Sequence, residues 1–76
     1  MDTIPLELLQ RGEQADVADV QGEPGWVHRM AELGIRAGSR LRVLQPGAPC
    51  VLMIGESRLT VRGDHLFQIF VRPVAG

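Results

Sequence analysis

Few side chains in this 76-residue sequence could carry out catalysis, and those that could are scattered along the chain. The possible nucleophiles are Ser39, Cys50 and Ser57, and the possible bases are His28 and His65. A serine or cysteine nucleophile needs a base within hydrogen-bonding reach, and no spacing here favours such a pair. The sequence contains no lysine for Schiff-base chemistry, no glycine-rich phosphate-binding motif and no HExxH motif. We therefore predict that the chain is not an enzyme.

The same residue types are possible ligands for a divalent transition metal, zinc or ferrous iron. The candidates are His28, Cys50, His65, Asp64 and Glu23, with Glu32 in support. No two of them have zinc-finger spacing. The favoured interpretation is that His28 is a solvated helix residue, His65 a turn residue and Cys50 a small apolar residue that opens a strand. No cofactor is required. A metal, if bound, would lie at the surface and be completed by water or by a second chain, giving a metal-bridged homo-oligomer.

Composition limits the remaining functions. Eight arginines are offset by nine acidic residues, which gives a net charge of −1 and argues against a nucleic-acid binder. The longest apolar run, Cys50 to Ile54, is far shorter than the ~20 residues of a membrane span, so we expect no membrane insertion. The first residues lack the pattern of a secretory signal, and one cysteine allows no intramolecular disulfide. These features predict one cytoplasmic domain over residues 1–76.

Two sets of side chains could bind a protein partner. The first is a group of arginines on outward strand and turn positions: Arg36, Arg40, Arg42, Arg58 and Arg62. They could pair with acidic side chains of a partner, although dispersed charge that keeps a small domain soluble is the favoured interpretation. The second set is Phe67 and Phe70 with Arg62 and Arg72, because Phe70 must face outward if Ile69 and Val71 face the core. We take this second set as the candidate partner interface, and Trp26 as a core residue.

The elements that position these residues follow from the hydrophobic pattern and the turn residues. Trp26–Leu33 has the spacing of an amphipathic helix that ends at Gly34, and Gly38 suits a type II turn. Gly55-Glu56 suits a hairpin turn. The predicted strands are Ala15–Val20, Arg40–Leu44, Val51–Ile54, Arg58–Arg62 and Gln68–Arg72, with single helical turns near Thr3–Leu9 and Gly63–Phe67. A mainly β fold follows: a small, closed five-stranded antiparallel barrel with one or two short helices.

The chain also resembles a known family. The pattern is carried by Leu6-x-x-Leu9-x-x-Gly12, by the run from Arg29-Met30 through Leu33-Gly34-Ile35 to Gly38, and by the strand positions Leu41, Val43, Leu59, Val61, Arg62, Ile69 and Val71. This pattern spans about Ile4 to Pro73 and resembles the FeoA family of ferrous iron transport proteins. The run with two glycines is its most specific part. Met30 stands where the family prefers leucine, and Ala37 where it prefers proline.

The resemblance implies an SH3-like barrel that acts in the cytoplasm as an accessory of FeoB, the membrane ferrous iron transporter. The alternative is a small metal-binding or metal-sensing protein, because the same module resembles the C-terminal domain of DtxR-type repressors. No helix-turn-helix precedes it here, which disfavours the repressor. The family carries over no catalytic residues, and its matched positions are structural glycines, such as Gly34 and Gly38, and core aliphatics.

Overall fold

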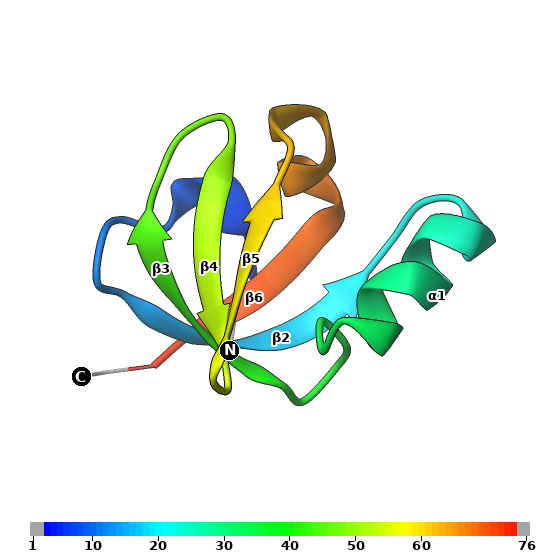
Figure 1. The fold of residues 1–76 in the computed structure, drawn as a ribbon, viewed down its shortest axis with the longest axis horizontal. Coiled ribbons are helices and arrows are strands. Elements are labelled where there is room, and N and C mark those ends of the chain that lie inside the picture. Colours follow the sequence, from blue (N-terminus) through cyan, green and yellow to red (C-terminus); the bar gives the residue numbers. More distant parts are fainter. Residues whose placement is uncertain (1–2, 75–76) are drawn as a thin grey trace.

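A computed structural model of the chain describes residues 3–74, apart from the side chains of residues 66 and 67. It is a curved sheet with one α-helix at its side and two short 3-10 helices (Figure 1). In chain order the elements are β1 (Ile4–Pro5), η1 (Leu6–Leu8), β2 (Gln14–Val20), α1 (Pro24–Glu32), β3 (Arg40–Gln45), β4 (Cys50–Ile54), β5 (Ser57–Val61), η2 (Gly63–Gln68) and β6 (Ile69–Pro73). No helix in the described part of the chain has the length and apolarity needed to span a membrane.

The six strands form one antiparallel sheet in the order β1-β6-β2-β3-β4-β5. The predicted number of five is wrong, because Ile4 and Pro5 pair with β6 where a helical turn was expected. Pro5 has an extended backbone, with φ −63° and ψ 145°, so the 3-10 turn begins only after it. The predicted closure is not found either. Within residues 3–74 no strand pairing joins β5 to β1, and these two strands are the edges of an open sheet.

The core lies on the concave side of the sheet and is built by alternating strand residues. In β3 the inward residues Leu41 and Val43 are each 1% exposed, while Arg40 and Arg42 face solvent. In β6, Ile69 and Val71 are fully buried, as predicted. The buried set is Leu6, Leu9, Ala15, Val17, Met30, Ile35, Leu41, Val43, Cys50, Leu52, Val61, Ile69 and Val71. Alternation in the inner strands therefore leaves one face of the sheet to solvent.

A glycine turn ends α1 as predicted. The Ile35 N–H donates to the Met30 carbonyl at 2.8 Å, and the Gly34 N–H donates to the Ala31 carbonyl at 3.1 Å. With Gly34 at φ 103°, these bonds define a Schellman motif, which satisfies carbonyls that the helix end leaves without partners. Ile35 then packs in the core. The helix is thereby held against the rest of the fold by its C-terminal end.

A bulge interrupts β2. Val17 pairs with Val71 and Asp19 pairs with Phe70, so Ala18 is an extra residue on the β2 side. The extra residue changes which side chains point inward, and Val17 and Val20 both contact the core although they are three apart. This explains why the apolar alternation of Ala15–Val20 is imperfect in the sequence.

Candidate functional site

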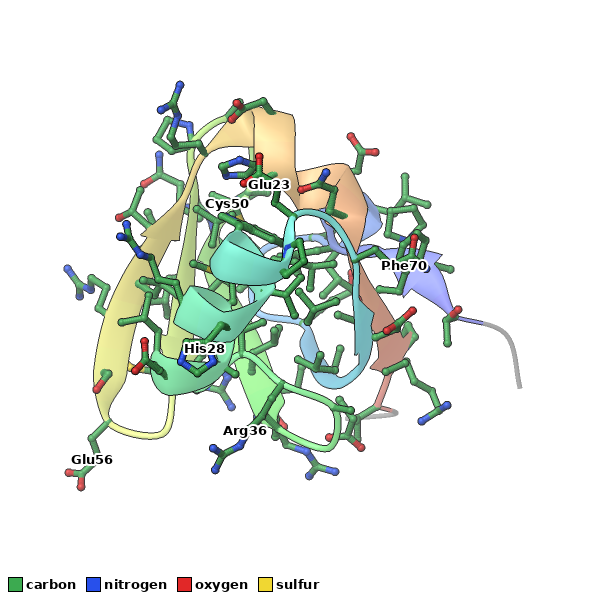
Figure 2. All side chains as sticks on the ribbon, turned by 90° about the vertical axis from the view of Figure 1, so that its right-hand side faces the viewer. Glu23, His28, Arg36, Cys50, Glu56 and Phe70 are labelled. Carbon is green, nitrogen blue, oxygen red and sulfur yellow. The ribbon has the colours of Figure 1, made fainter. Side chains whose placement is uncertain are left out.

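The predicted metal ligands lie apart. Glu23 precedes α1 as its N-cap residue, His28 lies in the middle of the helix, and Cys50 begins β4 (Figure 2). The His65 ring lies against Trp26 in a tilted arrangement, with ring centroids 4.7 Å apart and an interplanar angle of 44°. Within residues 3–74, no group of three or more histidine, cysteine, aspartate or glutamate side chains is placed to hold a metal ion. His28 and Glu32 form a pair of possible ligands, with Nε2 and Oε2 3.7 Å apart on the exposed side of the helix.

Cys50 belongs to the core. Its side chain is 3% exposed, and burial raises the pKa of the thiol because a thiolate loses its hydration there. A thiol with a raised pKa is a poor nucleophile and a poor metal ligand at neutral pH. The interpretation of Cys50 as a small apolar residue at the start of a strand therefore agrees with its position.

The residues of the predicted partner interface are separated as well. Phe70 does face away from the core, but it is half-buried beside Pro5 on β1 and Asp19 on β2. Arg72 lies two residues further along the same side of β6. Arg62 follows β5, which three strands separate from β6 in the sheet, and its Nε is 3.6 Å from Asp64 Oδ1. The side chain of Phe67 lies outside the described part of the structure. Phe70 and Arg72 thus share a surface that Arg62 does not adjoin along the sheet.

The outward side of the sheet instead gathers four arginines from three strands. We call this surface the arginine face; it consists of Arg40, Arg42, Arg58 and Arg72 with Gln14, Asp16, Leu44 and Met53. The strand register builds it. Gln14 is paired with Arg42, Arg42 with Met53, and Met53 with Arg58, which makes one row across four neighbouring strands. Met53 therefore stands between two guanidinium groups.

A second row lies beside the first. Asp16 is paired with Arg40 on one side and with Arg72 on the other. Asp16 Oδ1 accepts a hydrogen bond from Arg40 Nε at 2.9 Å, and Oδ2 accepts one from Nη2 at 3.3 Å. This bidentate contact is the main reason that the pKa of the Asp16 carboxyl is lowered, with a further contribution from the charge of Arg72. The only carboxylate of the arginine face is thus already engaged by Arg40.

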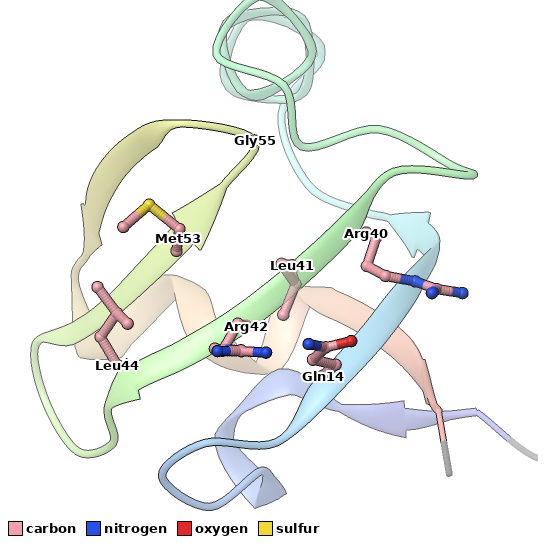
Figure 3. A pocket seen from close by; sticks show the side chains of 7 residues that line it. All are labelled: Gln14, Arg40, Leu41, Arg42, Leu44, Met53 and Gly55. Carbon is pink, nitrogen blue, oxygen red and sulfur yellow. The ribbon is translucent and has the colours of Figure 1, made fainter. Parts of the chain in front are cut away.

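A hollow of about 500 Å³ opens in the arginine face. Figure 3 shows the side chains of Leu44 and Met53 close together at one end of it, with Arg42 beside them. Gln14, Arg40, Leu41 and Gly55 complete the lining. The hollow therefore combines apolar side chains with guanidinium groups that donate hydrogen bonds.

The sequence pattern predicts Arg40, Arg42 and Arg58 as outward residues but does not single out Gln14, Leu44 or Met53. The alternation of Cys50–Ile54 was a usable signal for Met53, because Leu52 and Cys50 face inward. The alternation within a single strand does not give the register between strands. That register places Met53 between Arg42 and Arg58.

The family model of the FeoA domain matches residues 4–73. No curated protein gives a significant match to the chain. The solution structure of the FeoA protein of Chlorobium tepidum is 33% identical, with 96% of this chain and 72% of that one covered and a TM-score of 0.88.

Two further structures extend the comparison. The zinc complex of Stenotrophomonas maltophilia FeoA, described as a procaryotic SH3 domain protein, is 25% identical, with 90% of this chain and 88% of that one covered and a TM-score of 0.77. A manganese-dependent transcriptional repressor in complex with manganese is 21% identical, with a TM-score of 0.87. It shares the fold over 97% of this chain but only 38% of its own length. With the family model matched over residues 4–73, the chain belongs to the FeoA family, whose fold is SH3-like.

Proposed function

We propose that this protein is a cytoplasmic accessory of ferrous iron transport that acts by binding the cytoplasmic part of a FeoB-type transporter, and that it has no catalytic activity of its own. The main support for this proposal is the match of residues 4–73 to the FeoA domain. The Stenotrophomonas maltophilia FeoA has been put forward as an activating factor of ferrous iron transport, which supports the same role here. The outward side of the sheet, with Phe70 and the arginine face, is the surface that we assign to the partner.

A binding assay with the cytoplasmic domain of a FeoB-type transporter tests this function. Phe70 projects from the outward side of β6 and can act as an apolar anchor, and such anchors account for much of the binding energy of an interface. We expect Phe70→Ala to weaken binding about tenfold or more, a loss of at least ~1.4 kcal/mol. Arg36→Gln, an exposed residue in the turn after α1, should leave binding unchanged. If the native chain does not bind the domain at all, the proposed function is wrong.

A second candidate function is metal binding, favoured by the zinc complex of the Stenotrophomonas maltophilia protein and by the geometry of His28 and Glu32. A zinc ion takes four ligands, and this pair supplies two from one helix face. We propose that zinc or ferrous iron, when bound here, joins two copies of the chain. Sedimentation velocity with and without zinc chloride should then show a zinc-dependent dimer that His28→Ala abolishes. Tight binding to the monomer, unaffected by His28→Ala, would contradict this assignment.

A further inference from the structure

The arginine face carries a charge opposite to that of the rest of the molecule. With Asp19, which is paired with the outward Phe70, this side of the sheet holds four of the eight arginines and two of the nine acidic residues, whereas the remainder of the chain holds four arginines and seven acidic residues. A chain of net charge −1 therefore presents a distinctly positive surface on one side of its sheet. Charge dispersed only for solubility would not be separated in this way.

The guanidinium groups of this face are only partly engaged. Arg40 is paired with Asp16. Arg42 contacts the neutral side-chain amide of Gln14, whose oxygen, when turned toward Arg42, accepts a hydrogen bond from Nε at 3.2 Å. In that orientation Arg42 Nη2 also donates to the Gln14 oxygen. Among the side chains that the structure describes, neither Arg42 nor Arg58 forms an ion pair. Neither of the two arginines that flank Met53 in the register is neutralised by a described carboxylate, so each keeps its positive charge for a carboxylate of a partner.

The hollow that Arg42 and Met53 line suits an apolar side chain. Arg58 does not line it, but it follows Met53 in the same row across the sheet. Its volume of about 500 Å³ is within the range of ligand pockets, roughly 300–1,000 Å³. Leu44 and Met53 line it and are both half-buried, so part of their apolar surface is still in contact with water. Methionine has an unbranched, adaptable side chain that can pack against inserted groups of different shape. An apolar centre with a charged rim is the usual arrangement at a protein interface.

These features favour a short acidic segment over other anionic partners. A nucleic acid or a membrane surface extends beyond the face and would meet the acidic residues of the remainder. The isoelectric point of the whole chain, about 6.0, also disfavours such a partner. A short segment contacts the face alone. It can also insert a side chain into the hollow, which a lipid surface or a phosphate backbone does not do.

We propose that the arginine face binds an acidic segment of a partner protein, in which a large apolar side chain enters the hollow and flanking carboxylates pair with Arg42 and Arg58. The inference deepens the proposed function by giving the chemistry of the partner segment. It can be tested without the transporter, so the two proposals can fail separately.

The probe is a fluorescein-labelled heptapeptide with a central leucine and three glutamates on each side, and binding is followed by fluorescence anisotropy. Arg42→Gln and Arg58→Gln should each weaken binding about 3- to 10-fold. Arg36→Gln is the matched control: it removes the same charge from a residue that lines a different hollow with Val27 and Ala31, and it should have no effect. Thermal unfolding of each variant confirms that the fold is intact.

Two altered peptides separate the contributions of the hollow and the charges. Replacing the central leucine by alanine should weaken binding about tenfold, because the apolar surface of the hollow is then left uncovered. Replacing the glutamates by glutamines should abolish binding. In NMR spectra of the ¹⁵N-labelled protein, the peptide should shift the amide signals of Arg42, Met53 and Arg58.

Several results would overturn the proposal. One is equal weakening by Arg36→Gln, which would show attraction by charge alone. Another is tighter binding of single-stranded DNA or of vesicles rich in phosphatidylserine than of the peptide. A third is self-association through this face, seen as a concentration-dependent sedimentation coefficient that Arg42→Gln abolishes. If the transporter domain binds the protein but the peptide does not, the proposed function is supported and the inference about an acidic segment is wrong.

Discussion

Gly34 has a φ of 103°, and a Cβ added there would lie 3.0 Å from Ile54 Cγ2. Gly38 has a similar φ of 96°, but a Cβ added there would meet no atom within 4 Å. Both substitutions to alanine incur the strain of the left-handed conformation, roughly 1–2 kcal/mol. We expect Gly34→Ala to lower the free energy of unfolding more than Gly38→Ala does, and the difference measures the contact with Ile54. Urea denaturation of the two variants gives both values, and equal losses would contradict the role of that contact.

The ion pair between Asp16 and Arg40 predicts a pH dependence of stability. Arg40 lowers the pKa of the Asp16 carboxyl below its ordinary value of 3.8, so the folded state binds a proton less readily than the unfolded state. The pair therefore stabilises the folded state fully at a pH above the pKa that Asp16 has in the unfolded chain. This stabilisation is lost as the pH falls through the lower pKa that Asp16 has in the folded chain. The melting temperature of the native chain should exceed that of Asp16→Asn at pH 7, and the difference should shrink below about pH 4. Arg40 is exposed and Asp16 only half-buried, so the difference is small.

Glu56 provides the control for this titration. It lies in the exposed hairpin turn, and among the described residues it forms no ion pair. Glu56→Gln should therefore change the melting temperature little at either pH. A difference between the native chain and Asp16→Asn that stayed constant from pH 7 to pH 3 would show that the pair does not contribute through its charge.

Single residues with a strict backbone requirement were predictable from the sequence. Gly34, Gly38 and Gly55 each have the positive φ that their turns were expected to need, because few residues other than glycine adopt it. Gln14 and Met53 were not predicted as parts of a binding surface. Their positions depend on which residues they face across strands, and a local pattern carries no such information.

At the scale of elements, successive side chains of β6 alternate between the buried and the outward side of the sheet. Ile69 is fully buried, whereas its neighbour Phe70 is half-buried on the other side. We expect Ile69→Ala to lower the free energy of unfolding by about 2–5 kcal/mol, and Phe70→Ala to cost less than the ~3–5 kcal/mol of a fully buried phenylalanine. Thermal and urea unfolding measure both. A larger loss for Phe70→Ala would mean that Phe70 acts mainly in stability and not as an anchor for a partner.

The long elements were predicted within one or two residues, and the errors fall where tertiary pairing decides the local structure. β1 has only two residues, one of them proline, and it is a strand because β6 lies beside it. The bulge of β2 shifts the inward positions by one, which hid part of that strand's alternation. Both features depend on contacts between segments that are distant in the sequence. Such contacts cannot be predicted from the local propensity of the residues.

At the scale of the whole molecule, the mainly β fold was predicted, while the number of strands and the closure of the barrel were not. Closure was expected because an open sheet leaves unpaired edges. Here the edges are short: β1 has two residues and β5 has five. The turns η1 and η2 lie against each other at one end of the sheet. The two-residue β1 thus leaves little unpaired edge, and β5 is the longer edge of the open sheet.

The unequal distribution of charge between the arginine face and the remainder gives this nearly neutral molecule an electric dipole. A dipole turns the molecule as it approaches a charged partner, before any contact forms. Added salt screens this long-range attraction over about 10 Å at 0.1 M and leaves close contacts less affected. The consequence is kinetic: salt should slow the association of the protein with an acidic partner much more than it speeds their dissociation.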